Sequence, residues 1–137
     1  MLSLRVMNAG EVKTFWVKQS DEDWRVVQSL FTNRHYAHTL FYCHLSLEKI
    51  LKALVVQKTK EHSPYIHNLL VLAQKAVIHV SQEQQEQFQE ITTFNVRARY
   101  DDIKYQFYRK ATKEYTEKYI EITKQLRLWL KKNYLKK

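Results

Sequence analysis

A histidine, a glutamate and a lysine stand one helical turn apart in the stretch FYCHLSLEKILKAL, as His44, Glu48 and Lys52. An imidazole titrates near neutral pH, and a carboxylate pairs with cations or accepts hydrogen bonds. At about 100° per residue, His44 lies at the centre of the apolar stripe of a helix, Glu48 lies about 40° away, and Lys52 is at the edge. The spacing therefore predicts a polar ladder, formed by these three residues, on the face that must enter the core.

Two arginines in the stretch RARYDD are the candidate partners of this polar ladder. A buried carboxylate needs a cation or hydrogen-bond donors, and Lys52 offers only partial help from the rim. In one interpretation, Arg97 or Arg99 donates a charge-assisted hydrogen bond to Glu48 and holds two helices together. In the other interpretation, the polar ladder and the two arginines line a pocket for an anionic ligand.

The positive charge of the chain is concentrated in its last quarter. Residues 104–137 hold 11 Lys and Arg against 3 Asp and Glu, a net charge of +8 out of +9 for the whole chain. A basic block suits a polyanion such as RNA or a nucleotide, although a solvated helix face has the same composition. Tyr100 and Tyr105 stand beside the arginines, where a base can stack on them. Three further tyrosines at helical spacing predict core and interface positions: Tyr108, Tyr115 and Tyr119.

One glycine and one proline in 137 residues predict long helices, because a sheet protein of this length needs many more turn residues. Helices are expected over residues 10–31, 34–60, 66–79, 81–97 and 103–134. Asn33 is positioned to cap the second of them, and Ser81 with Gln84 forms a capping box for the fourth. Short connections predict an all-α, up-and-down bundle of four to five helices. We expect one domain over residues 1–137, with its core in residues 11–133.

The apolar residues predict both a core and a second packing surface. Phe15 and Val26 belong to the apolar stripe of the first helix. Trp24, Leu45 and Ile50 lie off the main stripes, so they are expected to remain exposed in a monomer. A symmetric homodimer is the simplest way to cover such a surface.

Several kinds of chemistry are excluded by composition. The single Cys43 allows no disulfide, one glycine forbids phosphate-binding glycine loops, and the six histidines have no zinc spacing. We therefore expect no metal and no cofactor. No apolar run reaches the roughly 20 residues of a membrane span, and no signal-peptide pattern is present. We expect a cytoplasmic protein that does not bind membranes.

Three stretches together resemble the prokaryotic HEPN domain family, whose name abbreviates "higher eukaryotes and prokaryotes nucleotide-binding". They are HLSLEKILKAL at 44–54, IHNLLVL at 66–72 and FNVRARYDD at 94–102. A fourth, KQSDEDWRVV at 18–27, is similar to the first helix of the family. The resemblance implies a four- or five-helix bundle, often a homodimer, with a nucleotide or RNA as ligand. It also implies a minimal nucleotidyltransferase as partner in a toxin–antitoxin-like pair.

Many members of that family are metal-independent endoribonucleases. They carry an arginine, then four to six residues, then a histidine near the start of the last helix. No arginine of this chain has a histidine at that spacing, and the residues after Arg97 and Arg99 read YDDIKYQFY. We therefore expect binding without cleavage. Two alternatives stay open: a purely structural, dimeric interaction module, and an endoribonuclease with a departed motif.

Overall fold

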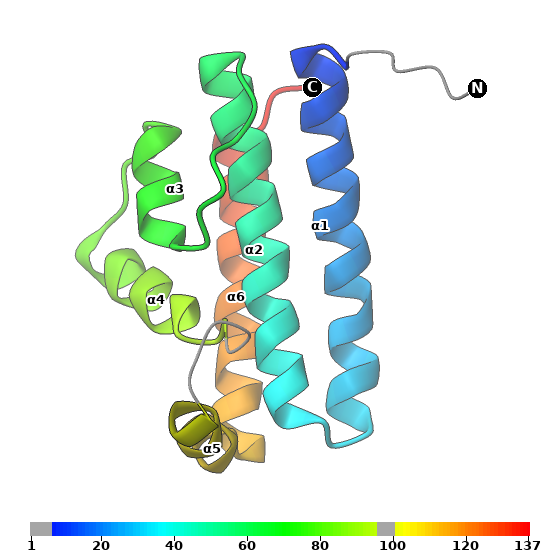
Figure 1. Ribbon diagram of the computed structural model, residues 1–137, viewed down its shortest axis with the longest axis vertical. Coiled ribbons are helices and arrows are strands. Elements are labelled where there is room, and N and C mark those ends of the chain that lie inside the picture. The colour runs from blue at the N-terminus through cyan, green and yellow to red at the C-terminus, as the bar shows by residue number, and fades with distance from the viewer. Residues whose placement is uncertain (1–6, 96–100) are drawn as a thin grey trace.

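The computed structural model describes residues 7–95 and 101–137. This part of the chain forms six helices (Figure 1): α1 Ala9–Thr32, α2 Tyr36–Thr59, α3 Leu69–Lys75, α4 Gln82–Thr92, α5 Asp101–Lys110 and α6 Lys113–Asn133. The predicted all-α fold is confirmed, with six helices in the described ranges in place of four or five. None of these helices has the length and apolar character needed to cross a membrane.

α2 is the central helix of the bundle. It packs against α1 and α6, and the short helices α3, α4 and α5 also contact it. Sixteen of its 24 residues are buried, so neighbours cover it on most sides. For this reason Ile50, which the sequence placed on an exposed surface, is fully buried, and that prediction is wrong. Trp24 and Leu45 are half-buried.

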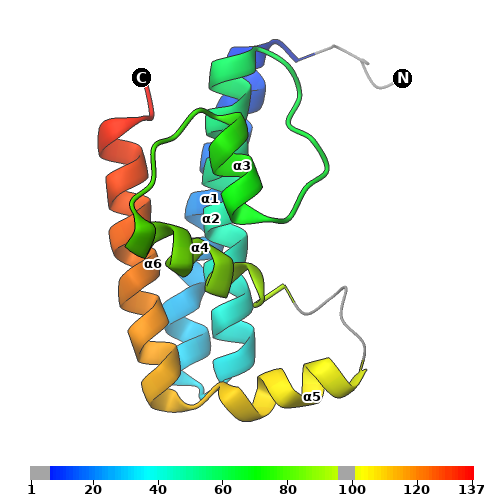
Figure 2. The ribbon, with the colours of Figure 1, turned by 90° about the vertical axis from the view of Figure 1, so that its left-hand side faces the viewer.

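The three long helices do not simply alternate in direction. α1 and α2 form the predicted up-and-down pair, joined by the tight turn at residues 33–35. α6 runs in the same direction as α2, as Figure 1 and Figure 2 both show. The chain returns to the start of α6 through the connection 60–68 and the short helices α3, α4 and α5. α1 and α6 both pack against α2.

The segment predicted as one helix over residues 103–134 is two helices. Thr112 has extended backbone angles and caps α6, since its hydroxyl accepts a hydrogen bond from the Tyr115 amide at 3.2 Å. α5 consequently lies across one end of the bundle (Figure 2) and buries Phe107 against the core. The neighbouring Tyr108 is 50% exposed and so does not belong to the core, while its place in an interface stays a prediction. Tyr119 is buried as predicted, and Tyr115 is half-buried.

α1 buries a narrower stripe than its sequence predicts. It packs chiefly against α2, and Phe15 and Val26 remain 47% and 38% exposed. Asn33 ends α1 and donates a hydrogen bond to the Ser29 carbonyl at 2.8 Å, so it does not cap α2. The capping box of Ser81 and Gln84 at the start of α4 is confirmed.

Candidate functional site

The polar ladder of α2 lies inside the bundle, as the spacing predicts. His44 is fully buried, and Glu48 and Lys52 are 4% and 5% exposed. The Glu48 carboxylate lies 3.1 Å from the Lys52 ammonium and 3.7 Å from Nε2 of His44. Lys52 is therefore a close, buried partner of Glu48, and its predicted place at the rim is wrong. Its ammonium also lies over the rings of Trp16, at 5.1 Å, and Tyr65, at 5.8 Å.

A fourth residue, His67, completes this cluster. Its Nδ1 lies 2.8 Å from Oε1 of Glu48, whereas Lys52 contacts Oε2. The His67 carbonyl lies 3.0 Å from Nε2 of His44. Burial lowers the pKa of His44, so its ring is neutral near pH 7 and Nε2–H donates to that carbonyl. These two hydrogen bonds fasten the connection between α2 and α3 onto α2. The charges of Glu48 and Lys52 are paired within the cluster.

Three of the candidate ligand-binding residues, Arg97, Arg99 and Tyr100, lie outside the described residues. The predicted contact between Glu48 and one of the arginines therefore stays a prediction. Tyr105 lies on α5 and is 64% exposed, with the Arg109 guanidinium 6.0 Å from its ring. Tyr105 thus has the accessible, cation-flanked ring that base stacking requires.

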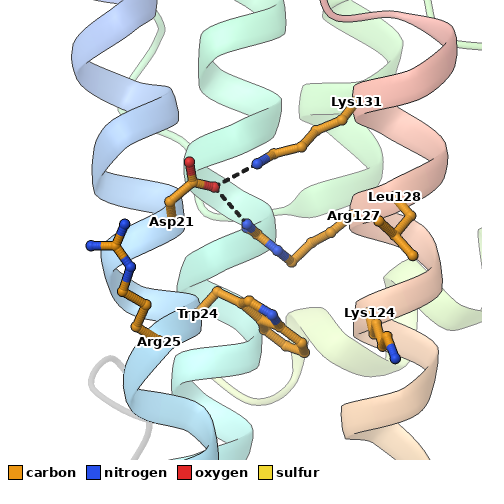
Figure 3. Close-up of a pocket in the computed structure, with 7 residues that line it drawn as sticks. All are labelled: Asp21, Trp24, Arg25, Lys124, Arg127, Leu128 and Lys131. Atoms are coloured by element: carbon orange, nitrogen blue, oxygen red, sulfur yellow. Dashed lines mark hydrogen bonds and ion pairs between the residues drawn. The ribbon is translucent and has the colours of Figure 1, made fainter.

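A pocket lies between α1 and α6 (Figure 3). Its volume is about 340 Å³, near the lower end of the range of about 300–1,000 Å³ found for ligand pockets. Its wall is formed by seven side chains: Asp21, Trp24 and Arg25 of α1, and Lys124, Arg127, Leu128 and Lys131 of α6.

The Arg127 guanidinium is held by groups of α1, one of which is in turn bonded to α2. Its Nη2 donates to the Asp21 carboxylate at 2.8 Å, and its Nη1 donates to the Ser20 hydroxyl. Ser20 in turn donates to the Ser46 carbonyl of α2 at 2.6 Å. The guanidinium also lies 5.3 Å from the centre of the Trp24 ring, a cation–π arrangement. Because Arg127 is only 5% exposed, this network fixes one positive charge at the base of the pocket.

Asp21 is shared between two cations. Lys131 donates to the same carboxylate oxygen at 2.6 Å, as the dashed lines in Figure 3 show. Burial alone would raise the pKa of Asp21, but the hydrogen bonds from Lys131 and Arg127 outweigh burial and lower it. Burial lowers the pKa of Arg127, and the bond to Asp21 opposes this effect. A guanidinium remains charged at neutral pH because its ordinary pKa is far higher.

The wall of the pocket carries a surplus of positive charge. Four of its seven residues are cationic and one is a carboxylate, which makes a net charge of +3. Arg25 also pairs with Glu22, at 2.8 Å, on the exposed side of α1. Lys124 is exposed and forms no ion pair with a described residue. The arrangement suits an anion that has an apolar or aromatic portion, because Trp24 and Leu128 line the same wall.

Comparison with known proteins identifies the fold family. The family model described as HEPN domain matches residues 14–134. The chain belongs to the HEPN domain family. No curated protein and no solved structure gives a significant match. The match extends through α1, α2 and α6, so the polar ladder and the pocket both lie within the HEPN domain.

Sequence reasoning missed His67 and the pocket residues of this HEPN domain. His67 lies in the connection 60–68, where no periodic pattern shows which side chain turns inward. A signal for Arg127 was present, since it follows Leu126 and lies three residues before Leu130, both buried. A buried arginine needs a carboxylate nearby, just as the buried Glu48 needs a cation, because an unpaired buried charge is costly.

Asp23 lies in the stretch KQSDEDWRVV, which resembles the first helix of the family, and it has a structural partner. Its carboxylate lies 2.6 Å from the Lys49 ammonium and so links α1 to α2. Within the described ranges, no group of three or more His, Cys, Asp or Glu side chains is arranged to hold a metal ion. The absence of a cofactor stays a prediction.

Proposed function

We propose that this HEPN domain binds nucleotides or RNA, and that the pocket between α1 and α6 holds an anionic group of the ligand. The observation that carries the proposal is the net charge of +3 around a cavity with a buried arginine and an indole ring. Cations that line a concave, partly apolar wall attract phosphate more strongly than scattered surface charges do. The net charge of +8 on residues 104–137 supplies attraction over a longer range.

The other candidate residues fall into two groups. His44, Glu48 and Lys52 are buried and paired with one another, which supports a positioning role more than direct anion binding. Arg97, Arg99, Tyr100 and Tyr105 are proposed to contact a longer strand, with the arginines on phosphates and the tyrosines on bases. For Tyr105, the exposed ring beside Arg109 supports this role.

Two assays on one preparation test the proposal. Binding of a fluorescent single-stranded RNA is expected at low salt and should weaken steeply as salt is raised, because each phosphate contact releases counterions. The same RNA should remain intact, since no arginine has the histidine spacing of the family's ribonucleases. Absence of RNA binding at low salt would contradict the proposed function. Metal-independent cleavage would support the ribonuclease alternative. A His44→Ala variant would then test whether cleavage depends on His44.

A minimal nucleotidyltransferase partner and a homodimer belong to the same proposal. Two exposed apolar side chains of α1, Phe15 and Val26, support a further packing surface. Sedimentation at tens of micromolar protein tests the dimer, and copurification with the product of a neighbouring nucleotidyltransferase gene tests the partner. A dimer that forms without any nucleotide or RNA binding would favour the structural interaction module.

A further inference from the structure

We infer that the pocket between α1 and α6 binds a terminal phosphate monoester of a nucleoside in preference to the internal phosphodiester of a strand. The ligand is either a free nucleotide or the phosphorylated end of an RNA, which share this chemistry. The inference rests on the proposed function and adds to it which phosphate the site selects. Three features of the pocket carry it: its residual charge, its donors and its size.

The residual charge of the pocket matches a dianion. Asp21 compensates one of the two cations that it contacts, Arg127 or Lys131, and Glu22 compensates Arg25. Lys124 and one further cation are left without a counter-charge, so about two positive charges remain. A phosphate monoester carries about −1.5 to −2 charge at pH 7. An internal phosphodiester carries a single negative charge and would leave one of the cations unpaired.

The donors of the pocket remain available on its open side. The Lys131 side chain is 34% exposed. Its ammonium directs one N–H to Asp21, so it keeps two donors for a ligand. Lys124 is exposed on the same helix, one turn before Leu128. Phosphate monoesters have three terminal oxygens that accept such charge-assisted hydrogen bonds. An internal phosphate offers only two oxygens of this kind.

The size of the pocket suits one nucleotide. A volume of about 340 Å³ admits a single small ligand, whereas a strand needs an extended groove. Trp24 is half-buried and presents its indole to the same space, with Leu128 opposite on α6 (Figure 3). A planar base stacks on an indole, so the apolar wall favours a nucleoside phosphate over inorganic phosphate.

Calorimetric titration of the full chain with four ligands tests the inference. The ligands are adenosine 5′-monophosphate, its methyl phosphodiester, adenosine and inorganic phosphate. We expect the monophosphate to bind about tenfold or more tightly than each of the other three, because each of them lacks one charge or one contact. Equal affinity for the monophosphate and its methyl ester would overturn the preference for a monoester. Equal affinity for inorganic phosphate would overturn the role of the nucleoside.

Alanine variants of two lysines on α6 show whether the pocket is responsible for binding the monophosphate. Lys124→Ala should reduce the affinity for the monophosphate about tenfold and that for the methyl ester less. Lys113→Ala is the control, since Lys113 is also exposed on α6 but does not line the pocket. Equal losses in the two variants would show general charge attraction and overturn the site. Trp24→Phe should retain the preference for the nucleoside, and Trp24→Leu should lose it.

A pair of RNA strands separates the two sources of the ligand. Single-stranded RNA of one sequence is compared with and without a 5′-phosphate. If the phosphorylated strand binds more tightly and Lys124→Ala abolishes this difference, the site binds RNA ends. If the two strands bind equally while adenosine 5′-monophosphate is still preferred over its methyl ester, the site binds free nucleotides. Salt-sensitive binding of all strands without any monoester preference would overturn this inference and leave the proposed function in place. No binding of any strand or nucleotide would overturn both.

Discussion

Replacing Glu48 by alanine is expected to lower the free energy of unfolding by about 3–5 kcal/mol. The carboxylate accepts from His67 at 2.8 Å and pairs with Lys52 at 3.1 Å, and it is only 4% exposed. Hydrogen bonds to a charged group contribute about 1.5–3 kcal/mol each. The two contacts together therefore account for about 3–6 kcal/mol. The Trp16 and Tyr65 rings give no new compensation, because they already face the Lys52 ammonium in the wild type.

Urea unfolding of a small set of variants measures this cost. Glu48→Gln keeps a hydrogen-bond acceptor for His67 and should lose less than Glu48→Ala. Adding Lys52→Met to Glu48→Ala removes the unpaired charge, so the double variant should be more stable than the single one. Glu117→Ala, at an exposed position of α6, is the control and should change stability by less than about 0.5 kcal/mol. A loss below about 1 kcal/mol for Glu48→Ala, or a double variant that is still less stable, would refute the reasoning.

Three further predictions concern single positions. Val77 is 51% exposed and has φ 57°, so Val77→Asn should raise the free energy of unfolding by about 1 kcal/mol in urea titrations. Burial lowers the pKa of His44 below 6.5, so wild-type stability should fall as pH drops below about 6.5, and His44→Gln should flatten that part of the stability profile. The lowered pKa of Asp21 means that Asp21→Asn should destabilise the protein at pH 7, by an amount that shrinks as pH falls below about 4. The same substitution should tighten anion binding at low salt.

Composition and periodicity were enough for the fold class and for the burial of the polar ladder. A single glycine and proline leave few ways to build sheets, and an apolar stripe passing through His44 and Glu48 predicts their burial. The requirement for a cation beside Glu48 was also correct, because burial makes it necessary. Spacing placed Lys52 one turn from Glu48 but at the rim, whereas it is buried, with its ammonium over the Trp16 ring. His67 was not predictable from spacing, because it comes from a connection without periodicity.

Neither the break before α6 nor the pocket could be predicted from the local sequence pattern, and the reasons differ. Apolar residues keep helical spacing across Ala111 and Thr112, so periodicity alone continues the helix through them. The pocket lies between α6 and the middle of α1. It depends on the direction in which α6 runs, which is the same as that of α2. That direction follows from how α3, α4 and α5 return the chain, a tertiary property that no local window contains.

The central claim is that the ligand binds between α1 and α6, and the indole N–H resonances of the three tryptophans test it most directly. Trp24 lines the pocket, whereas Trp16 lies beside Lys52 and Trp129 packs on Tyr134. Titration with adenosine 5′-monophosphate or single-stranded RNA should shift the Trp24 indole resonance in two-dimensional nitrogen–proton NMR spectra and leave the other two in place. Binding that shifts Trp16 or Trp129 while Trp24 stays unchanged would contradict the account.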